Sequence, residues 1–211
     1  KAFGYTQEDL TLLMEPTAIR GGESIGSMGN DVPLAVLSQR PQLLFNYFKQ
    51  LFAQVTNPPL DAIREELVTS TETFIGKELN LFEETPEHCH QIKLLEPILT
   101  NVEIQKIREA KLGDIRAITI STVFPITNSE NGLRESLKKV CDQTVEAVKN
   151  GYSIIILSDR AVGSNSAPIP SLLATSTVHH HLVREGLRTK TGLLVESGEP
   201  REVAHFALLI A

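Results

Sequence analysis

The sequence contains no tryptophan, few aromatic residues (5%) and only two cysteines, Cys89 and Cys141. The cysteines lie far apart and form no CxxC pair, so the cysteine motifs of zinc and iron–sulfur sites are absent. We expect two reduced thiols. No run approaches the ~18 consecutive apolar residues of a membrane-spanning helix.

Positive charge is also scarce. Lysine and arginine number 20 against 26 acidic residues, which gives a net charge of −6. General nucleic-acid binders and proteins of anionic membranes usually carry the opposite sign, so we expect neither kind of partner. The 41% hydrophobic and 22% charged content is ordinary for a globular protein.

The two ends of the sequence indicate a piece of a longer polypeptide. The first residue is Lys1 and not methionine, and the last six, Phe206–Ala211, are apolar without a polar tail or a cap. A natural terminus rarely cuts through a hydrophobic element.

Residues 1–112 show no regular alternation of strands and helices. We expect helices at 1–14, 41–54, 63–67 and 101–111, a glycine-rich loop at 15–33, and a polar, irregular stretch at 76–101. Thr100 and Glu103 have the spacing of a capping box for the 101–111 helix.

Predicted strands and helices alternate regularly along residues 113–211. Strands are predicted at 115–123, 153–157 and 193–195, and helices at 133–148, at 172–186 and from Pro200 onward. Continuous apolar strands between helices favour a parallel sheet covered on both faces. The predicted fold class is α/β: an irregular helical and loop part (1–112), then β-α-β-α-β-α units (113–211) of a (β/α)8 barrel or an open doubly wound sheet.

Functional groups of parallel α/β folds gather at the carboxyl ends of strands. Asp159 and Glu196 follow two predicted strands and are candidates for acid–base or ligand-binding roles. The alternative is structural: Asp159 pairs with Arg160 or closes a turn, and Glu196 caps the helix behind Pro200. Neither strand end has the glycine-rich phosphate cradle of a dinucleotide site or a P-loop.

His179, His180 and His181 are adjacent, so on a helix they point about 100° apart and cannot converge on one metal ion. No metal site is predicted there. The segment Gly21–Pro33 is more unusual, since glycines alternate with small polar residues. Its backbone can approach a ligand or another domain closely, or it forms a tight structural turn.

Several strings in this sequence, taken in order, resemble the central domain of glutamate synthase large chains. They are Phe3–Thr6, Gly26–Asp31, Pro33–Ser38, Tyr47–Pro59, Ile63–Glu66, Leu157–Arg160, Ala167–Ala174, Val178–Leu182 and Val195–Gly198. The sequence departs from the family pattern at Val32, where threonine is expected, and at Thr17, where methionine is expected.

The resemblance implies a segment of an oxidoreductase that makes two glutamates from glutamine and 2-oxoglutarate. In that family an amidotransferase domain releases ammonia from glutamine. A barrel domain with FMN and a 3Fe-4S cluster uses the ammonia, with electrons from ferredoxin or from NAD(P)H through an NAD(P)H-oxidising subunit. The central domain resembles a degenerate (β/α) barrel, joins the two catalytic domains and helps line an ammonia tunnel. We therefore expect no catalytic residue and no cofactor in this segment.

The tunnel candidates lie in the glycine-rich loop: Ser27, Met28, Gly29, Asn30 and Asp31. Two alternatives stay open, a purely structural spacer without ligand contact and a stand-alone (β/α) enzyme that uses Asp159 and Glu196. The sequence decides neither the electron donor nor whether the enzyme belongs to a bacterial cytoplasm or a plastid stroma.

Overall fold

The computed structural model describes residues 2–21, 33–49, 59–126 and 131–211. The chain forms two compact units, one of Lys1–Ser70 with Glu199–Ala211 and one of Thr71–Gly198. The sequence predicted irregular structure up to residue 112 and a regular alternation of strands and helices after it. That a domain boundary lies at this point stays a prediction.

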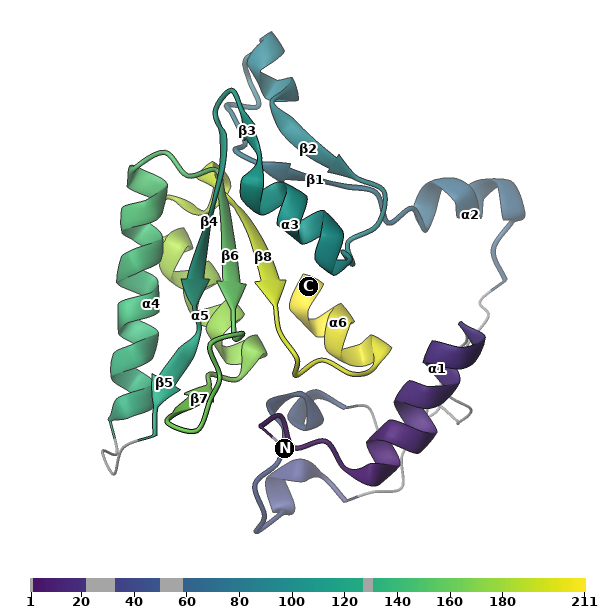
Figure 1. Ribbon diagram of the computed structural model, residues 1–211. Helices are drawn as coiled ribbons and strands as arrows, with labels where there is room; N and C mark the ends of the chain where they lie inside the picture. The colour runs from purple at the N-terminus through teal and green to yellow at the C-terminus, as the bar shows by residue number, and fades with distance from the viewer. Residues whose placement is uncertain (1, 22–32, 50–58, 127–130) are drawn as a thin grey trace. The chain divides into compact units, whose positions relative to one another are not determined.

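The larger unit contains the predicted parallel sheet. Its strand order is β3-β4-β6-β8, in which β4 (Ile115–Ser121), β6 (Ile154–Ser158) and β8 (Gly192–Glu196) are parallel (Figure 1). The short β3 (Lys111–Leu112) pairs antiparallel with β4. The three predicted strands are therefore confirmed to within a few residues.

Two predicted crossover helices connect these strands. They are α4 (Gly132–Lys149) and α5 (Ser171–Arg184), and each is followed by a glycine with positive φ, Gly151 (84°) and Gly186 (65°). Only glycine adopts this backbone conformation without steric cost, so the predicted stop signals act as expected. Beside the helices lie a small antiparallel ribbon, β5 (Val123–Pro125) with β7 (Ser166–Pro168), and a 3-10 turn, η5 (Arg188–Lys190).

Both faces of the sheet are covered, because successive side chains of β6 point to opposite sides. Ile155 and Leu157 join one apolar cluster with α4 and α5, which Figure 1 shows on the same face of the sheet. Ile154 and Ile156 belong to the other cluster, which includes Ile75, Leu94, Ile104 and Ile107. The expectation of a sheet buried on both faces is confirmed.

The second face is covered by elements that the sequence predicted only in part. Helix α3 (Asn101–Glu109) was predicted, and its capping box is present: the Thr100 hydroxyl accepts from the Glu103 N–H, and the Glu103 carboxylate accepts from the Thr100 N–H. The hairpin of β1 (Thr73–Gly76) and β2 (Gln91–Leu94) was not, and the prediction of an irregular stretch at 76–101 is wrong there. Each strand has only four residues, too few for a clear alternating pattern.

The barrel-like part of the fold prediction is not confirmed. Within the described residues the sheet is open, with β3 and β8 at its edges, and no barrel closes. The third predicted helix, α6 (Val203–Ile210), belongs to the other compact unit.

The smaller unit is helical and irregular. A π-helical segment, η1 (Asp9–Met14), continues into α1 (Glu15–Arg20), so the loop predicted from residue 15 starts too early. Pro16 lies at the start of α1, where a missing N–H is tolerated. The remaining elements are the 3-10 turns η2 (Ala35–Leu37) and η3 (Leu44–Phe48), and helix α2 (Ala62–Val68), which confirms the predicted short helix at 63–67.

The burial in two elements of this unit differs from that of an amphipathic α-helix. Within the range 41–54, where a helix was predicted, the described structure is the 3-10 turn η3, in which Phe45 is buried while Tyr47 and Phe48 are exposed. In α6 the buried residue is His205, whose ring stacks on Phe45 at 4.2 Å between centroids, while Val203 and Ile210 are exposed.

A buried arginine connects distant segments of the smaller unit. The side chain of Arg201 is 3% exposed and donates to the Asp9 carboxylate (2.9 Å) and to the Phe3 carbonyl (2.6 Å). Its guanidinium also lies 4.0 Å from the centre of the Tyr5 ring. Residues 3–9 are thus fixed to the segment that precedes α6.

We predict that Ile156→Ala strongly destabilises the larger unit. Ile156 is fully buried between the sheet and α3, so the change removes apolar contact and leaves a cavity at a cost of about 3 kcal/mol. Hydrogen exchange of the β6 amides in the full-length polypeptide should accelerate by about two orders of magnitude. The control is Ile63→Ala at an exposed position of α2, and unchanged exchange in Ile156→Ala would contradict the assigned core.

Candidate functional site

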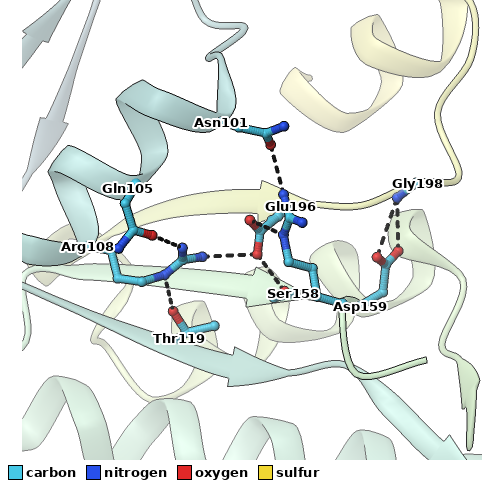
Figure 2. A network of polar contacts seen from close by, with 9 residues as sticks. Asn101, Gln105, Arg108, Thr119, Ser158, Asp159, Glu196 and Gly198 are labelled. Atoms are coloured by element: carbon cyan, nitrogen blue, oxygen red, sulfur yellow. Dashed lines mark hydrogen bonds and ion pairs between the residues drawn. The ribbon is translucent and has the colours of Figure 1, made fainter. Parts of the chain in front are cut away.

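The carboxyl edge of the parallel sheet brings together the two strand-end candidates. The register places Ser158 of β6 opposite Glu196 of β8, and the Asp159 N–H donates to the Glu196 carbonyl at 3.1 Å. Asp159 and Glu196 are therefore neighbours, as the parallel arrangement requires, and their side chains enter two different networks (Figure 2).

Glu196 lies between two arginines. Its side chain is 9% exposed and accepts from Arg108 Nη2 at 3.0 Å and from Arg160 Nε at 2.6 Å. The Ser158 hydroxyl donates to the same oxygen as Arg108, at 2.6 Å. Both carboxylate oxygens thus have a charged donor, which is the stronger class of hydrogen bond.

The two arginines are themselves held in place, largely by α3. Arg108 donates to Thr119 of β4 at 3.1 Å and to Gln105 at 2.7 Å, and Arg160 donates to Asn101 at 2.8 Å (Figure 2). Asn101, Gln105 and Arg108 recur at spacings of four and three, so they share one helix face. Sequence reasoning missed this face, although the correctly predicted cap at Thr100 fixes where it begins.

The charge state of Glu196 follows from these contacts. Burial by itself raises the pKa of this carboxyl group, but hydrogen bonds from Ser158, Arg160 and Arg108 outweigh it and hold the pKa below its ordinary value. Glu196 is therefore a carboxylate at neutral pH, with its oxygens occupied by donors of its own chain.

Asp159 closes the chain after β8. It is buried, and its carboxylate accepts from the Ser197 hydroxyl and from the Gly198 N–H, at 3.3 Å to the nearer oxygen. Arg160 pairs with Glu196, and Glu196 forms ion pairs with Arg108 and Arg160. The turn-closing alternative for Asp159 matches this geometry.

Arg108, Arg160, Ser158 and Glu196 connect α3, β6 and β8, and we call this group of contacts the clamp. A general base needs an oxygen that can reach a substrate proton, and the described geometry gives both carboxylates internal partners instead. The ion pairs join residues 88 and 36 positions apart in the sequence. They therefore hold the ends of β6 and β8 against α3.

The remaining sequence candidates lie elsewhere. Ser27, Met28, Gly29, Asn30 and Asp31 are outside the described residues. His179 accepts from Arg188 Nε at 3.0 Å, and burial followed by the charges of Arg188 and His180 lowers its pKa. Within the described ranges no three histidine, cysteine or acidic side chains are placed to hold a metal ion.

The two cysteines are separate and unlike each other. Cys89 is exposed in the 3-10 turn η4 (Pro86–Cys89), and Cys141 is buried in α4, where burial raises the pKa of its thiol.

Two surface grooves border α4, one towards β4 and one towards α5, and neither is lined by Asp159 or Glu196. No helix in the described part of the chain is long and apolar enough to cross a membrane.

Comparison with known proteins decides the family. A family model described as the glutamate synthase central domain matches residues 1–211. The chain belongs to the glutamate synthase central domain family. It is 50% identical over 210 residues to the NADPH-dependent large chain of Bacillus subtilis, which covers 100% of the chain and 14% of that relative.

Two further relatives use other electron donors by name. The chain is 43% identical to ferredoxin-dependent glutamate synthase 2 of Synechocystis (99% of the chain, 13% of the relative). It is 42% identical to the NADH-dependent enzyme of Saccharomyces cerevisiae (99% of the chain, 10% of the relative). The chain thus spans between one tenth and one seventh of the length of these relatives.

The residues of this segment do not fit the cofactors that the resemblance implies for the whole enzyme. A 3Fe-4S cluster needs several thiolates close together, whereas the chain has two cysteines on different elements. At the carboxyl edge of the sheet, the two arginines that could bind a flavin phosphate are already paired with Glu196. That the segment binds neither group stays a prediction.

We predict that Glu196→Gln weakens the clamp by about 2 kcal/mol, since two arginines then lose their carboxylate while the side chain keeps its shape. Hydrogen exchange of the β8 amides in the full-length polypeptide should become about 30-fold faster. Glu185→Gln, an exposed carboxylate at the end of α5, is the control. Equal exchange in both variants would show that the ion pairs add nothing.

The same clamp should respond to acid. Burial raises the folded pKa of Glu196, but hydrogen bonds from Ser158, Arg160 and Arg108 outweigh it and hold this pKa below the unfolded value. The contribution of Glu196 to stability is therefore complete above the unfolded pKa of about 4.3. It is lost as pH falls through the folded pKa. Protection factors of β8, corrected for intrinsic exchange, should fall in this acid range for the parent and not for Glu196→Gln, and parallel profiles would contradict the assignment.

Proposed function

We propose that this chain is the central domain of a glutamate synthase large chain. The whole enzyme would convert glutamine and 2-oxoglutarate into two glutamates, with FMN and a 3Fe-4S cluster in other domains. Support comes from the family match over residues 1–211 and from relatives that carry this name. The proposal extends to an amidotransferase and an FMN-binding domain in the same polypeptide.

The segment itself would connect these domains and perform no chemistry. The observation that carries this proposal is the carboxyl edge of the sheet, where Glu196 is paired with Arg108 and Arg160. In a catalytic α/β domain this edge offers groups to a substrate. Here it stabilises the scaffold, which argues against a stand-alone enzyme built on Asp159 and Glu196.

Ammonia transfer is the finer part of the proposal. The loop with Ser27, Met28, Gly29, Asn30 and Asp31 would face the path between the two catalytic domains. Neutral ammonia needs few and weak polar contacts, since strong binding would slow its passage, as it does for ions in a channel. Glycine has no side chain that would project into the passage, and Ser27 and Asn30 supply small polar groups.

The second candidate is a structural spacer without ligand contact. It is compatible with the ends of β6 and β8, where Glu196 is paired with residues of its own chain. The two candidates differ in whether the loop touches ammonia. The electron donor is not fixed, because similar relatives are named for NADPH, NADH and ferredoxin. Relatives of bacterial and chloroplastic origin leave a bacterial cytoplasm or a plastid stroma as the proposed location.

The test is uncoupling in the full-length enzyme. Gly29→Leu with Asn30→Leu should fill the passage, so glutamine hydrolysis would exceed glutamate formation several-fold while glutaminase activity persists. The control is Ser176→Leu at an exposed position of α5. Both reactions are measured with reduced ferredoxin and with NAD(P)H as donors.

Matched rates in the double variant would remove the loop from the tunnel and favour the spacer. Absence of glutamate synthesis by the unmodified, flavin-loaded enzyme with every donor would contradict the proposed enzyme itself.

A further inference from the structure

The connection between β1 and β2 exposes two large apolar side chains. Leu81 is 90% exposed and Phe82 is 98% exposed, the two highest exposures among the large apolar residues of the described chain. A single exposed leucine is common on protein surfaces, but an adjacent pair with a fully exposed aromatic ring is not.

This pair is held by a well-bonded turn. The Glu83 N–H donates to the Asn80 carbonyl at 3.0 Å, so Leu81 and Phe82 are the central residues of a hydrogen-bonded β-turn. The Asn80 side chain accepts from the Phe82 N–H at 3.2 Å and donates to the Glu83 carboxylate at 2.9 Å. The backbone and side chain of one asparagine thus hold both apolar residues.

The next turn supports the first. His88 Nε2 lies 3.0 Å from the Asn80 carbonyl oxygen, and His88 Nδ1 lies 3.0 Å from the Thr85 carbonyl oxygen, so the ring connects the two turns. The Glu78 N–H is bonded to the Thr189 carbonyl at 2.8 Å, which fixes the start of the connection to the rest of the unit. The apolar pair is therefore presented in a defined geometry.

Leucine and phenylalanine are unusual residues for the central positions of a β-turn. Central turn positions favour glycine, proline, asparagine, aspartate and serine, because these residues adopt the turn geometry and tolerate water. Leucine and phenylalanine gain nothing there from this chain, since they are not buried against it. A local rule broken without internal compensation is typical of a site made for contact with something else.

The surroundings of the pair are acidic. Residues 78–87 contain four glutamates, Glu78, Glu83, Glu84 and Glu87, and no lysine or arginine. Hydrogen bonds from Thr85 and from its own backbone keep the pKa of Glu87 below its ordinary value. A complementary surface would combine an apolar pocket with a basic rim.

We infer that Leu81 and Phe82 insert into an apolar pocket with a basic rim on the remainder of the same large-chain polypeptide. The chain covers only 14% of the Bacillus relative, so most of the polypeptide is available to provide this pocket. The inference rests on the proposed function, for it names a point at which the central domain docks against a neighbouring domain.

Hydroxyl-radical footprinting of the full-length enzyme tests it without a substitution. Oxidation of Phe82 is compared between native and urea-unfolded enzyme by mass spectrometry, with buried Phe45 as the protected reference. The expected result is at least a tenfold slower oxidation of Phe82 in the native enzyme. Phe82 oxidised at the unfolded rate while Phe45 is protected would overturn the inference.

Two further experiments identify the surface that covers Leu81 and Phe82. Protection that disappears on dilution to a single polypeptide would assign the pocket to a second copy and overturn the inference. Glu84→Lys should raise Phe82 oxidation at least threefold through repulsion by the rim, with Lys77→Gln as the control outside the acidic run. No response to Glu84→Lys would overturn the basic rim.

The outcome is separable from the proposed function. Footprinting reports burial of Phe82 whether or not the enzyme makes glutamate, while coupled turnover is measured independently. An active, coupled enzyme with a freely oxidised Phe82 would overturn only this docking point. A protected Phe82 in an enzyme that makes no glutamate would instead contradict the proposed function.

Discussion

Strand β6 buries all five of its residues, Ile154–Ser158, and the rest of the larger unit is arranged to cover it. Its apolar side chains alternate between two clusters, so neither face can be left to water. Helices α4 and α5 cover one face, and α3 with the β1–β2 hairpin covers the other. Because α3 lies on that second face, it also carries Arg108 to the end of β8. The burial of one strand therefore determines where the polar clamp can form.

The clamp is the feature of this α/β framework on which the proposed positioning role rests. The carboxyl ends of β6 and β8 bring Ser158, Asp159 and Glu196 together, as in an enzyme of this class. Two arginines then occupy the carboxylate of Glu196, and Ser197 and Gly198 occupy that of Asp159. The two carboxylates therefore have opposite charges or hydrogen-bond donors of the same unit beside them.

Local signals predicted much of the regular structure. Continuous apolar runs identified β4, β6 and β8, and the Thr100–Glu103 box and the glycines after α4 and α5 set helix ends. The hairpin strands were missed because only Ile75 and Leu94 of their eight residues are fully buried and apolar. Arg108 could not be assigned, since its partner is 88 positions away and no local pattern encodes such a pair. The exposed Leu81 and Phe82 carried no periodic signal at all.

If the carboxyl edge of the sheet has the proposed positioning role, the chain's own side chains fill it throughout turnover of the proposed full-length glutamate synthase. A high-resolution structure of that enzyme, frozen during turnover with glutamine, 2-oxoglutarate and an electron donor, tests it most directly. A positioning role predicts that Glu196 lies between Arg108 and Arg160 with no ligand at the ends of β6 and β8. Release of Glu196 from either arginine, with a substrate or cofactor in its place, would contradict it.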